Sequence, residues 1–189
     1  MKTRIWIIFL AAYLLLAGCR RAEIAPPAAP APPLDTPAPE IRQDEEIPPV
    51  ALERLTVEVA VAWEDADRML AQLEELSRLL EDALAASGCT IEEPATVTIG
   101  TAGGITAQAL QDGGVDAAFL PEGDFAEIEG GADMILACPD IGMVAAVSAA
   151  KPALDQAFQN CFAKALAETE AGQEFLAICY PGAVFTIAE

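Results

Sequence analysis

Apolar positions recur with strand-like and helix-like periods from about residue 52 onward. Residues 55–62 alternate and then turn apolar, as a strand with a buried face would. Residues 66–86 carry apolar side chains three and four positions apart, which predicts one long amphipathic helix facing a core. Residues 96–99, 105–111 and 115–120 have the patterns of a strand, a short helix and a strand, joined by glycine-rich turns. Such short connections predict a parallel βαβ unit at the centre of the fold.

The C-terminal part of the chain continues this alternation. Pro139-Asp140 is a turn between two apolar strand candidates, residues 134–138 and 141–148. A helix is expected over residues 153–169, with Pro152 near its start, and a shorter helix over residues 173–178 after a break at 170–172. Residues 184–187 are an edge-strand candidate. The whole pattern predicts an α/β fold: one three-layer lobe with a mainly parallel sheet of about five strands flanked by helices.

The N-terminus has the proportions of a signal peptide. Two basic residues precede an apolar run over residues 5–17 that is too short to span a bilayer comfortably. Leu16-Ala17-Gly18-Cys19 resembles the lipobox of bacterial lipoproteins, in which the cysteine becomes the lipidated first residue. We therefore expect residues 1–19 to be a lipoprotein signal peptide and Cys19 to anchor the protein to the extracytoplasmic face of the cell membrane. The alternatives are an ordinary signal peptide, or an uncleaved anchor helix with a buried cysteine.

Residues 20–51 are rich in proline and alanine, as in IAPPAAPAPPLDTPAPE. Proline fixes φ and removes backbone donors, so this segment is expected to be an extended, disordered linker outside any core. The alternative is a recognition segment for a proline-binding partner. The folded domain is then expected to cover residues 52–189.

Composition and charge narrow the function classes. The formal net charge is −20, and the pI is about 4.1, so phosphate backbones would be repelled and nucleic-acid partners are not expected. The chain has no histidine, the commonest general base and metal ligand. Its serines therefore lack a histidine partner, and its acids lack calcium-loop spacing. We expect no enzyme, no metal site and no cofactor.

Three stretches carry a resemblance to a known family: residues 55–57 with the acid-capped helix after them, Gly113 to Pro121 (GGVDAAFLP) and Glu170 to Leu176 (EAGQEFL). In this order they resemble the substrate-binding lipoproteins of ABC importers, which have the type II periplasmic-binding-protein fold. The phosphonate- and sulfonate-binding branch is the nearest group. The resemblance covers the whole folded domain. It implies a solute-binding role for a phosphonate, a sulfonate or another small solute, and an ABC permease as a partner.

The chain departs from this family in size. Full-size members have two lobes, whereas here the strand candidate 141–148 leads directly to the C-terminal helices. We therefore expect a single, truncated lobe that pairs with a permease or a second lobe. The alternative function is a non-transport lipoprotein that uses a degenerate lobe to bind a protein or the cell envelope.

Ligands of open α/β sheets lie at the carboxyl ends of the strands. At that edge the sequence places seven tentative ligand-binding residues: Trp63, Thr101, Gly103, Gly104, Pro121, Glu122 and Phe125. Backbone N–H groups near Gly103 and Gly104 at a helix start would suit an anion. The alternatives are that Thr101 only caps the helix and that Trp63 is a partly buried hydrophobe.

Four cysteines follow Cys19, namely Cys89, Cys138, Cys161 and Cys179. Outside the cytoplasm an even number can pair in three ways. Cys161 and Cys179 lie on consecutive helices, so that disulfide is our tentative expectation. Buried free thiols at Cys138 and Cys161 are the alternative.

Overall fold

The computed structural model describes residues 49–101, 104–128 and 130–188. The predicted signal peptide, Cys19 and most of the predicted linker lie outside these residues. The strands are β1 (Val50–Leu52), β2 (Thr56–Val61), β3 (Cys89–Ile91), β4 (Thr96–Thr101), β5 (Ala117–Pro121), β6 (Ala132–Cys138), β7 (Met143–Ser148) and β8 (Thr186–Ile187). The helices are α1 (Ala66–Leu70), α2 (Leu73–Ala86), α3 (Ile105–Gln111), α4 (Glu122–Ala126), α5 (Gln156–Glu168) and α6 (Glu170–Cys179), with a short 3₁₀ turn at Trp63–Asp65.

The main sheet is mixed, in the order β4-β2-β5-β7-β6-β8. β2 pairs in parallel with both β4 and β5, while β7 is antiparallel to β5 and β6, and β8 is antiparallel to β6. The α/β class with flanking helices is confirmed, but the expectation of a mainly parallel sheet is wrong. The reason lies in the short turn between β6 and β7, because parallel strands need a crossover of a dozen or more residues.

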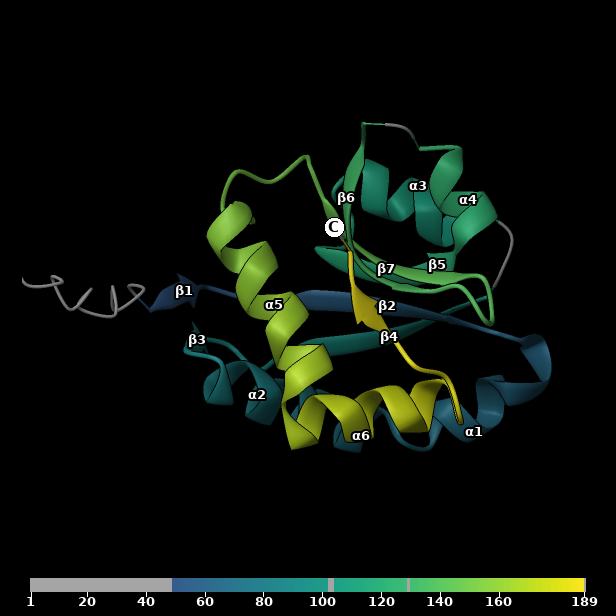
Figure 1. Ribbon diagram of the computed structural model, residues 1–189, viewed down its shortest axis with the longest axis horizontal. Coiled ribbons are helices and arrows are strands. Elements are labelled where there is room, and N and C mark those ends of the chain that lie inside the picture. The colour runs from purple at the N-terminus through teal and green to yellow at the C-terminus, as the bar shows by residue number, and fades with distance from the viewer. Residues whose placement is uncertain (1–48, 102–103, 129, 189) are drawn as a thin grey trace, which may run out of the picture. The chain divides into compact units, whose positions relative to one another are not determined.

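Helices cover both faces of this sheet, which makes three layers (Figure 1). Val57, Val59 and Val61 point to one face and enter a large core with α1, α2, α5 and α6. The alternate positions of β5, Ala118 and Leu120, point to the other face and pack under α3 in a smaller core. Successive side chains of a strand point to opposite faces of the sheet, and this alternation places them in two separate cores.

Three helix boundaries differ from those expected. The helix expected over residues 66–86 is interrupted after α1, where the Gln72 N–H donates to the Met69 carbonyl at 2.9 Å in a tighter turn. α5 begins at Gln156 rather than near Pro152, because the Asp155 carboxylate caps it by accepting from two backbone N–H groups at 3.1 Å. The break before α6 falls at Thr169, and residues 170–172 belong to the helix.

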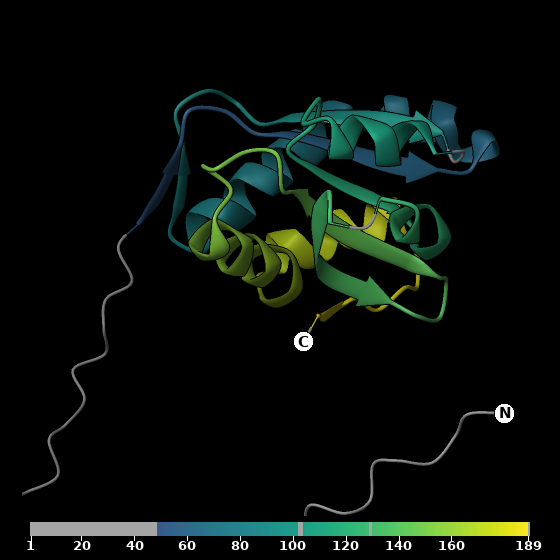
Figure 2. The same ribbon diagram turned by 90° about the horizontal axis from the view of Figure 1, so that it is seen from above.

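A second, two-stranded sheet pairs β1 with β3 in parallel. Figures 1 and 2 show these two strands side by side at the end of the molecule away from α1. β1 therefore begins two residues before the predicted domain start at residue 52, because Val50 and Ala51 pair with Cys89 and Thr90.

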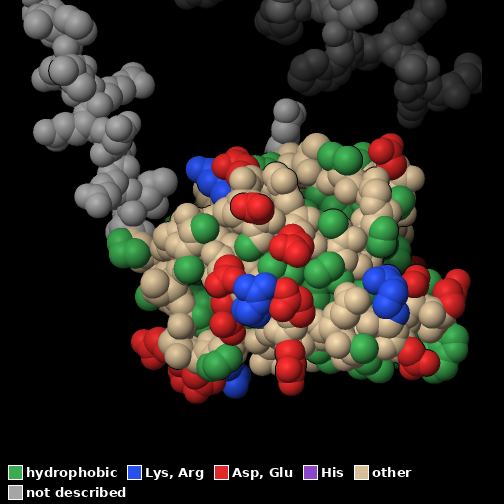
Figure 3. All heavy atoms as spheres, turned by 90° about the horizontal axis from the view of Figure 1, so that it is seen from below, with side chains coloured by type: hydrophobic (Ala, Val, Ile, Leu, Met, Phe, Trp, Pro, Cys, Tyr) green, Lys and Arg blue, Asp and Glu red, His purple; other side chains and the backbone are tan. Residues whose placement is uncertain are grey.

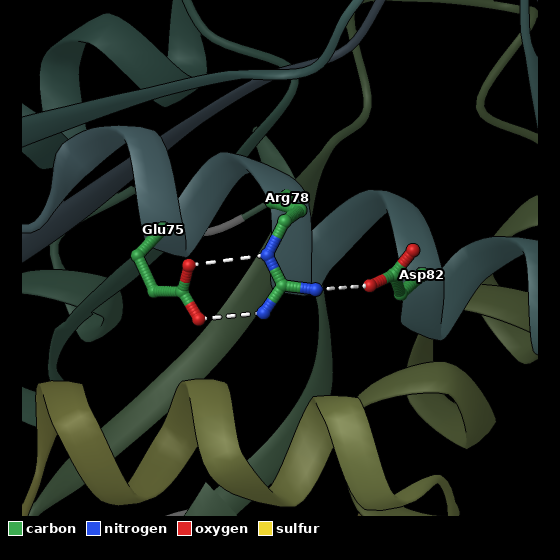
Figure 4. Close-up of polar contacts among 3 residues, drawn as sticks. All are labelled: Glu75, Arg78 and Asp82. Atoms are coloured by element: carbon green, nitrogen blue, oxygen red, sulfur yellow. Dashed lines mark hydrogen bonds and ion pairs between the residues drawn. The ribbon is translucent and has the colours of Figure 1, made fainter.

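The exposed face of α2 is strongly acidic. Figure 3 shows acidic side chains scattered over the side of the molecule seen from below, with few basic ones among them. On α2, the Arg78 guanidinium donates to Glu75 at 2.6 and 3.1 Å and to Asp82 at 2.7 Å (Figure 4). This hydrogen bonding lowers the pKa of Glu75. All three side chains are exposed, so the network adds little stability.

Candidate functional site

The carboxyl ends of the parallel strands meet at one edge of the main sheet. Val61 of β2 lies opposite Thr101 of β4, and β5 ends beside them at Pro121. The turn between β6 and β7 returns to the same edge, since Met143 pairs with both Pro121 and Cys138. This carboxyl edge therefore gathers four loops from distant parts of the chain.

A pocket of about 360 Å³ lies at this edge, and we call it the rim pocket. Its walls come from the ends of β2 and β5, the start of β7 and the end of α6. The lining residues are Ala60, Val61, Ala62, Asp65, Pro121, Ile141, Met143, Cys179, Tyr180, Pro181 and Ala183. Most of these side chains are apolar, so the pocket suits the apolar part of a small molecule.

Tyr180 anchors the inner side of the rim pocket. Its hydroxyl donates to the Ala60 carbonyl at 2.9 Å, and its ring packs 5.9 Å from Phe119 and 5.5 Å from Phe185. Burial raises the pKa of Tyr180 well above its ordinary value and raises the pKa of the adjacent Cys179 thiol to about 12. Both groups are therefore neutral near pH 7, and neither is a nucleophile or base at that pH.

Asp65 is the one charged residue in the lining of the rim pocket. Its carboxylate lies 3.3 Å from the Arg68 guanidinium, which also donates to the Ile178 carbonyl at 3.1 Å. Arg68 thus ties α1 to the end of α6. Both charged groups are partly exposed, so the Asp65 carboxylate can also accept a hydrogen bond from a ligand.

The predicted ligand-binding residues whose side chains the structure describes do not form one site. Pro121 lines the rim pocket, whereas Trp63 is 81% exposed and is not among the lining residues. Phe125 is partly buried, packs against the smaller core and is not among the lining residues of the rim pocket. Glu122 begins α4 with an exposed side chain, and its N–H donates to the Gly142 carbonyl at 2.8 Å.

The start of α3 does not offer the expected anion site. Gly104 adopts a φ of 81°, and its N–H donates to the Asp124 carboxylate at 3.3 Å. A carboxylate of the chain itself therefore occupies this position, and its charge would repel an anionic ligand. The Thr101 side chain and Gly103 lie outside the described residues.

The acid of the GGVDAAFLP stretch has a structural role. Asp116 is 3% exposed and precedes β5, at the end of the strand opposite the rim pocket. Its carboxylate accepts from the Thr56 N–H at 2.7 Å and pairs with the Lys151 ammonium. Asp116 therefore joins the starts of β2 and β5 to the segment after β7, while only Pro121 of this stretch reaches the pocket.

A second acid, partly buried, lies beneath α3. The Glu58 carboxylate on β2 accepts a hydrogen bond of 2.5 Å from the Thr106 hydroxyl. A Cβ at Gly100 would collide with both of these side chains, which is why β4 carries glycine there. This polar contact holds α3 on the sheet and leaves the Glu58 carboxylate engaged within the protein.

The four described cysteines are all buried free thiols. The expected Cys161–Cys179 disulfide is wrong, because the two residues lie at opposite edges of the sheet. Cys179 lines the rim pocket, whereas the Cys161 thiol donates to the Ser87 carbonyl at 3.3 Å, at the end of α2. Being on consecutive helices does not bring the two residues together.

The sequence reasoning missed Tyr180, Ile141 and Met143, which carry much of the pocket lining. One signal was available for the last two. A short turn between two strands forces an antiparallel hairpin, so the residues after Pro139-Asp140 must start at the edge where the preceding strand ends. No comparable local signal exists for Tyr180.

In the described part of the chain, no helix is both long and apolar enough to cross a bilayer. Within the same residues, cysteine and acidic side chains form no cluster of three that could hold a metal ion. No known protein family, curated protein or solved structure matches this chain.

Proposed function

We propose that this protein is a membrane-anchored, extracytoplasmic lipoprotein whose single lobe binds a small solute in the rim pocket. The lipobox at Cys19 supports the anchor and the location. The resemblance of the folded domain to ABC-importer binding proteins, which have the type II periplasmic-binding-protein fold, supports a role in solute import. An ABC permease or a second lobe is then the partner that completes the site.

The observation that carries this proposal is the position of the pocket. The rim pocket lies where the parallel strands β2 and β5 end, which is the edge at which open α/β sheets bind ligands. Its volume of about 360 Å³ falls in the range of small-molecule sites.

The charges near the pocket favour a ligand with an apolar body and a neutral or cationic head. Asp65 lines the pocket, and Glu122 and Asp124 follow Pro121 on α4. These carboxylates would repel phosphonates and sulfonates. Our proposal therefore takes the fold and the binding edge from that branch, but not its anionic ligands. A small amine or an apolar amino acid fits the lining better.

A second function is favoured by the apolar side chains exposed at this edge. Ile141 lines the pocket and is 47% exposed, and Trp63 follows the lining residue Ala62 and is 81% exposed. An exposed tryptophan is typical of protein contact sites. The alternative is thus a non-transport lipoprotein that docks a protein or the cell envelope at this edge.

Thermal-shift and calorimetric screening tests the first function. We expect an amine or apolar amino acid to raise the melting temperature, whereas phosphonates and sulfonates leave it unchanged. Ala62→Trp fills the pocket mouth from an exposed position and should abolish the shift. Asp65→Asn should weaken an amine about tenfold, since it removes one charge-assisted hydrogen bond.

The matched control is Ala86→Trp, which adds the same side chain at an exposed position at the end of α2. A shift that survives Ala62→Trp would place the ligand elsewhere and contradict the proposal. The alternative function would be favoured if no solute raised the melting temperature and if Trp63→Ala abolished the binding of a protein partner.

A further inference from the structure

Two of the four cysteines lie in contact at the amino edge of the sheet. Cys89 is the first residue of β3 and Cys161 lies within α5, which packs against both β1 and β3. The two side chains belong to the same buried core, and each thiol lies close enough to the other to affect its pKa. The Cys161 thiol also donates to the carbonyl of Ser87, two residues before Cys89, at 3.3 Å.

We propose that Cys89 and Cys161 are a disulfide-forming pair, oxidised by thiol–disulfide exchange. A disulfide reagent or a protein disulfide oxidant accepts two electrons: its S–S bond breaks, the Cys89–Cys161 S–S bond forms, and two reduced thiols leave carrying the two protons. In the cell this step rests on the proposed export, since the cytoplasm keeps thiols reduced. In purified protein it rests on the geometry alone.

The positions of the other two cysteines exclude them as partners for Cys89. Cys138 ends β6 and Cys179 ends α6, both at the carboxyl edge. All four described thiols are buried, but Cys89 and Cys161 are the two that lie together at the amino edge.

Burial decides when the bond forms. It raises the pKa of Cys89 to about 12 and also raises the pKa of Cys161, so thiolate is scarce in the folded protein and exchange there is slow. Oxidation is faster while the chain folds, and the buried bond afterwards resists reductants. Cys89 is among the residues that line a hollow of about 380 Å³ at the amino edge, but only 1% of it is exposed.

The bond would join α5 to the end of α2 and to the β1–β3 sheet. It would close a loop between positions 89 and 161, and loops of such length restrict the unfolded chain strongly. The oxidised protein is therefore expected to melt about 10 °C above the reduced protein.

The test uses the full chain with Cys19→Ser, which removes the lipid and the fifth thiol. The protein is unfolded, then refolded with oxidised glutathione or with a reductant. After blocking with maleimide under denaturing conditions, mass spectrometry should find two free thiols in the oxidised sample and a peptide linking Cys89 to Cys161. Cys89→Ala and Cys161→Ala should each abolish the melting shift, whereas Cys138→Ala should retain it.

Four free thiols after oxidative refolding would overturn the proposal, as would a linkage between Cys161 and Cys179. A separate experiment tests export: cells are alkylated at harvest, and the disulfide-linked peptides of the protein are mapped by mass spectrometry. A pair that forms in vitro but is recovered reduced from cells would count against export and leave the thiol pair established.

Discussion

At the scale of single residues, burial controls ionisation on the inner side of the rim pocket. Cys179 and Tyr180 are neighbours in sequence, and both keep their protons because the folded protein withdraws them from water. An unfolded thiol ionises near pH 8.5. Above that pH the folded state therefore holds a proton on Cys179 that the unfolded state has lost, and stability falls as the pH rises.

This predicts an alkaline weakening that one substitution reduces. Near pH 7 Cys179→Ala should lower the free energy of unfolding by about 1–2 kcal/mol through lost packing. Between about pH 9 and 11 the wild type should lose roughly 1 kcal/mol per pH unit more than the variant, because its thiol stays protonated until about pH 12. Urea unfolding of reduced protein at a series of pH values measures both slopes. Parallel slopes would contradict this assignment.

Single residues were predictable where their role is local. Pro121 was placed at the pocket edge because it ends a strand, and the strand end is visible in the sequence. Tyr180 was not, because its contact with Ala60 spans 120 residues and depends on how α6 packs. The packing of Phe125 against the smaller core likewise depends on the position of other elements, which the local sequence does not show.

At the scale of elements, the junction between α5 and α6 brings the backbones of the two helices close together. The Thr169 hydroxyl donates to the Ala165 carbonyl at 2.5 Å and accepts from the Gly172 N–H at 3.0 Å. Gly172 lies so close to α5 that a Cβ there would come within 2.6 Å of the Leu166 Cα and would collide with the Ala165 carbonyl. Close backbone approach is therefore the reason for glycine at this position.

Gly172→Ala is expected to destabilise the protein by about 2–3 kcal/mol, because the added methyl group meets backbone atoms that cannot move aside without separating the two helices. Gly123→Ala is the matched control within α4, where a Cβ meets no atom within 4 Å. It should be neutral or stabilising by up to about 1 kcal/mol. Chemical denaturation of both variants decides the matter, and equal effects would refute the close-approach explanation.

The elements themselves were largely predictable, whereas their order in the sheet was not. The elements β4, α3 and β5 follow one another as expected, because short glycine turns and β-branched residues define them locally. Their central position was not confirmed, since β4 is an edge strand and β2 lies between β4 and β5. The sheet became mixed because of the β6–β7 hairpin, whose consequence for strand direction the apolar pattern does not contain. The disulfide expectation failed similarly, since helix order says nothing about which edge each thiol occupies.

At the scale of the whole molecule, the two edges of the sheet have different contents. The carboxyl edge holds the apolar rim pocket. The amino edge holds the Asp116–Lys151 pair, the Cys89–Cys161 contact and the β1–β3 sheet. Anchoring, in our proposal, acts through Cys19, which precedes β1 in the chain, so attachment and binding use different parts of the protein.

Cys19→Ser should therefore release the protein from membranes without altering the folded lobe. We expect the variant in the soluble fraction, with the same melting temperature and the same solute-induced shift as detergent-extracted wild type. Cys138→Ala is the control, because it removes a thiol outside the lipobox and should leave the protein in the membrane fraction. Retention of the Cys19→Ser variant in membranes would disprove lipid anchoring at this residue.

The contact between the Tyr180 hydroxyl and the Ala60 carbonyl also bears on the order of events during synthesis. These two residues can meet only after residue 180 has left the ribosome. Until then β2 lacks the support of α6, and the large core lacks Phe175. A nascent chain that cannot complete its core remains unfolded longer, which would suit the export that we propose. The same delay keeps Cys89 and Cys161 accessible to an oxidant until the last helix closes over the sheet.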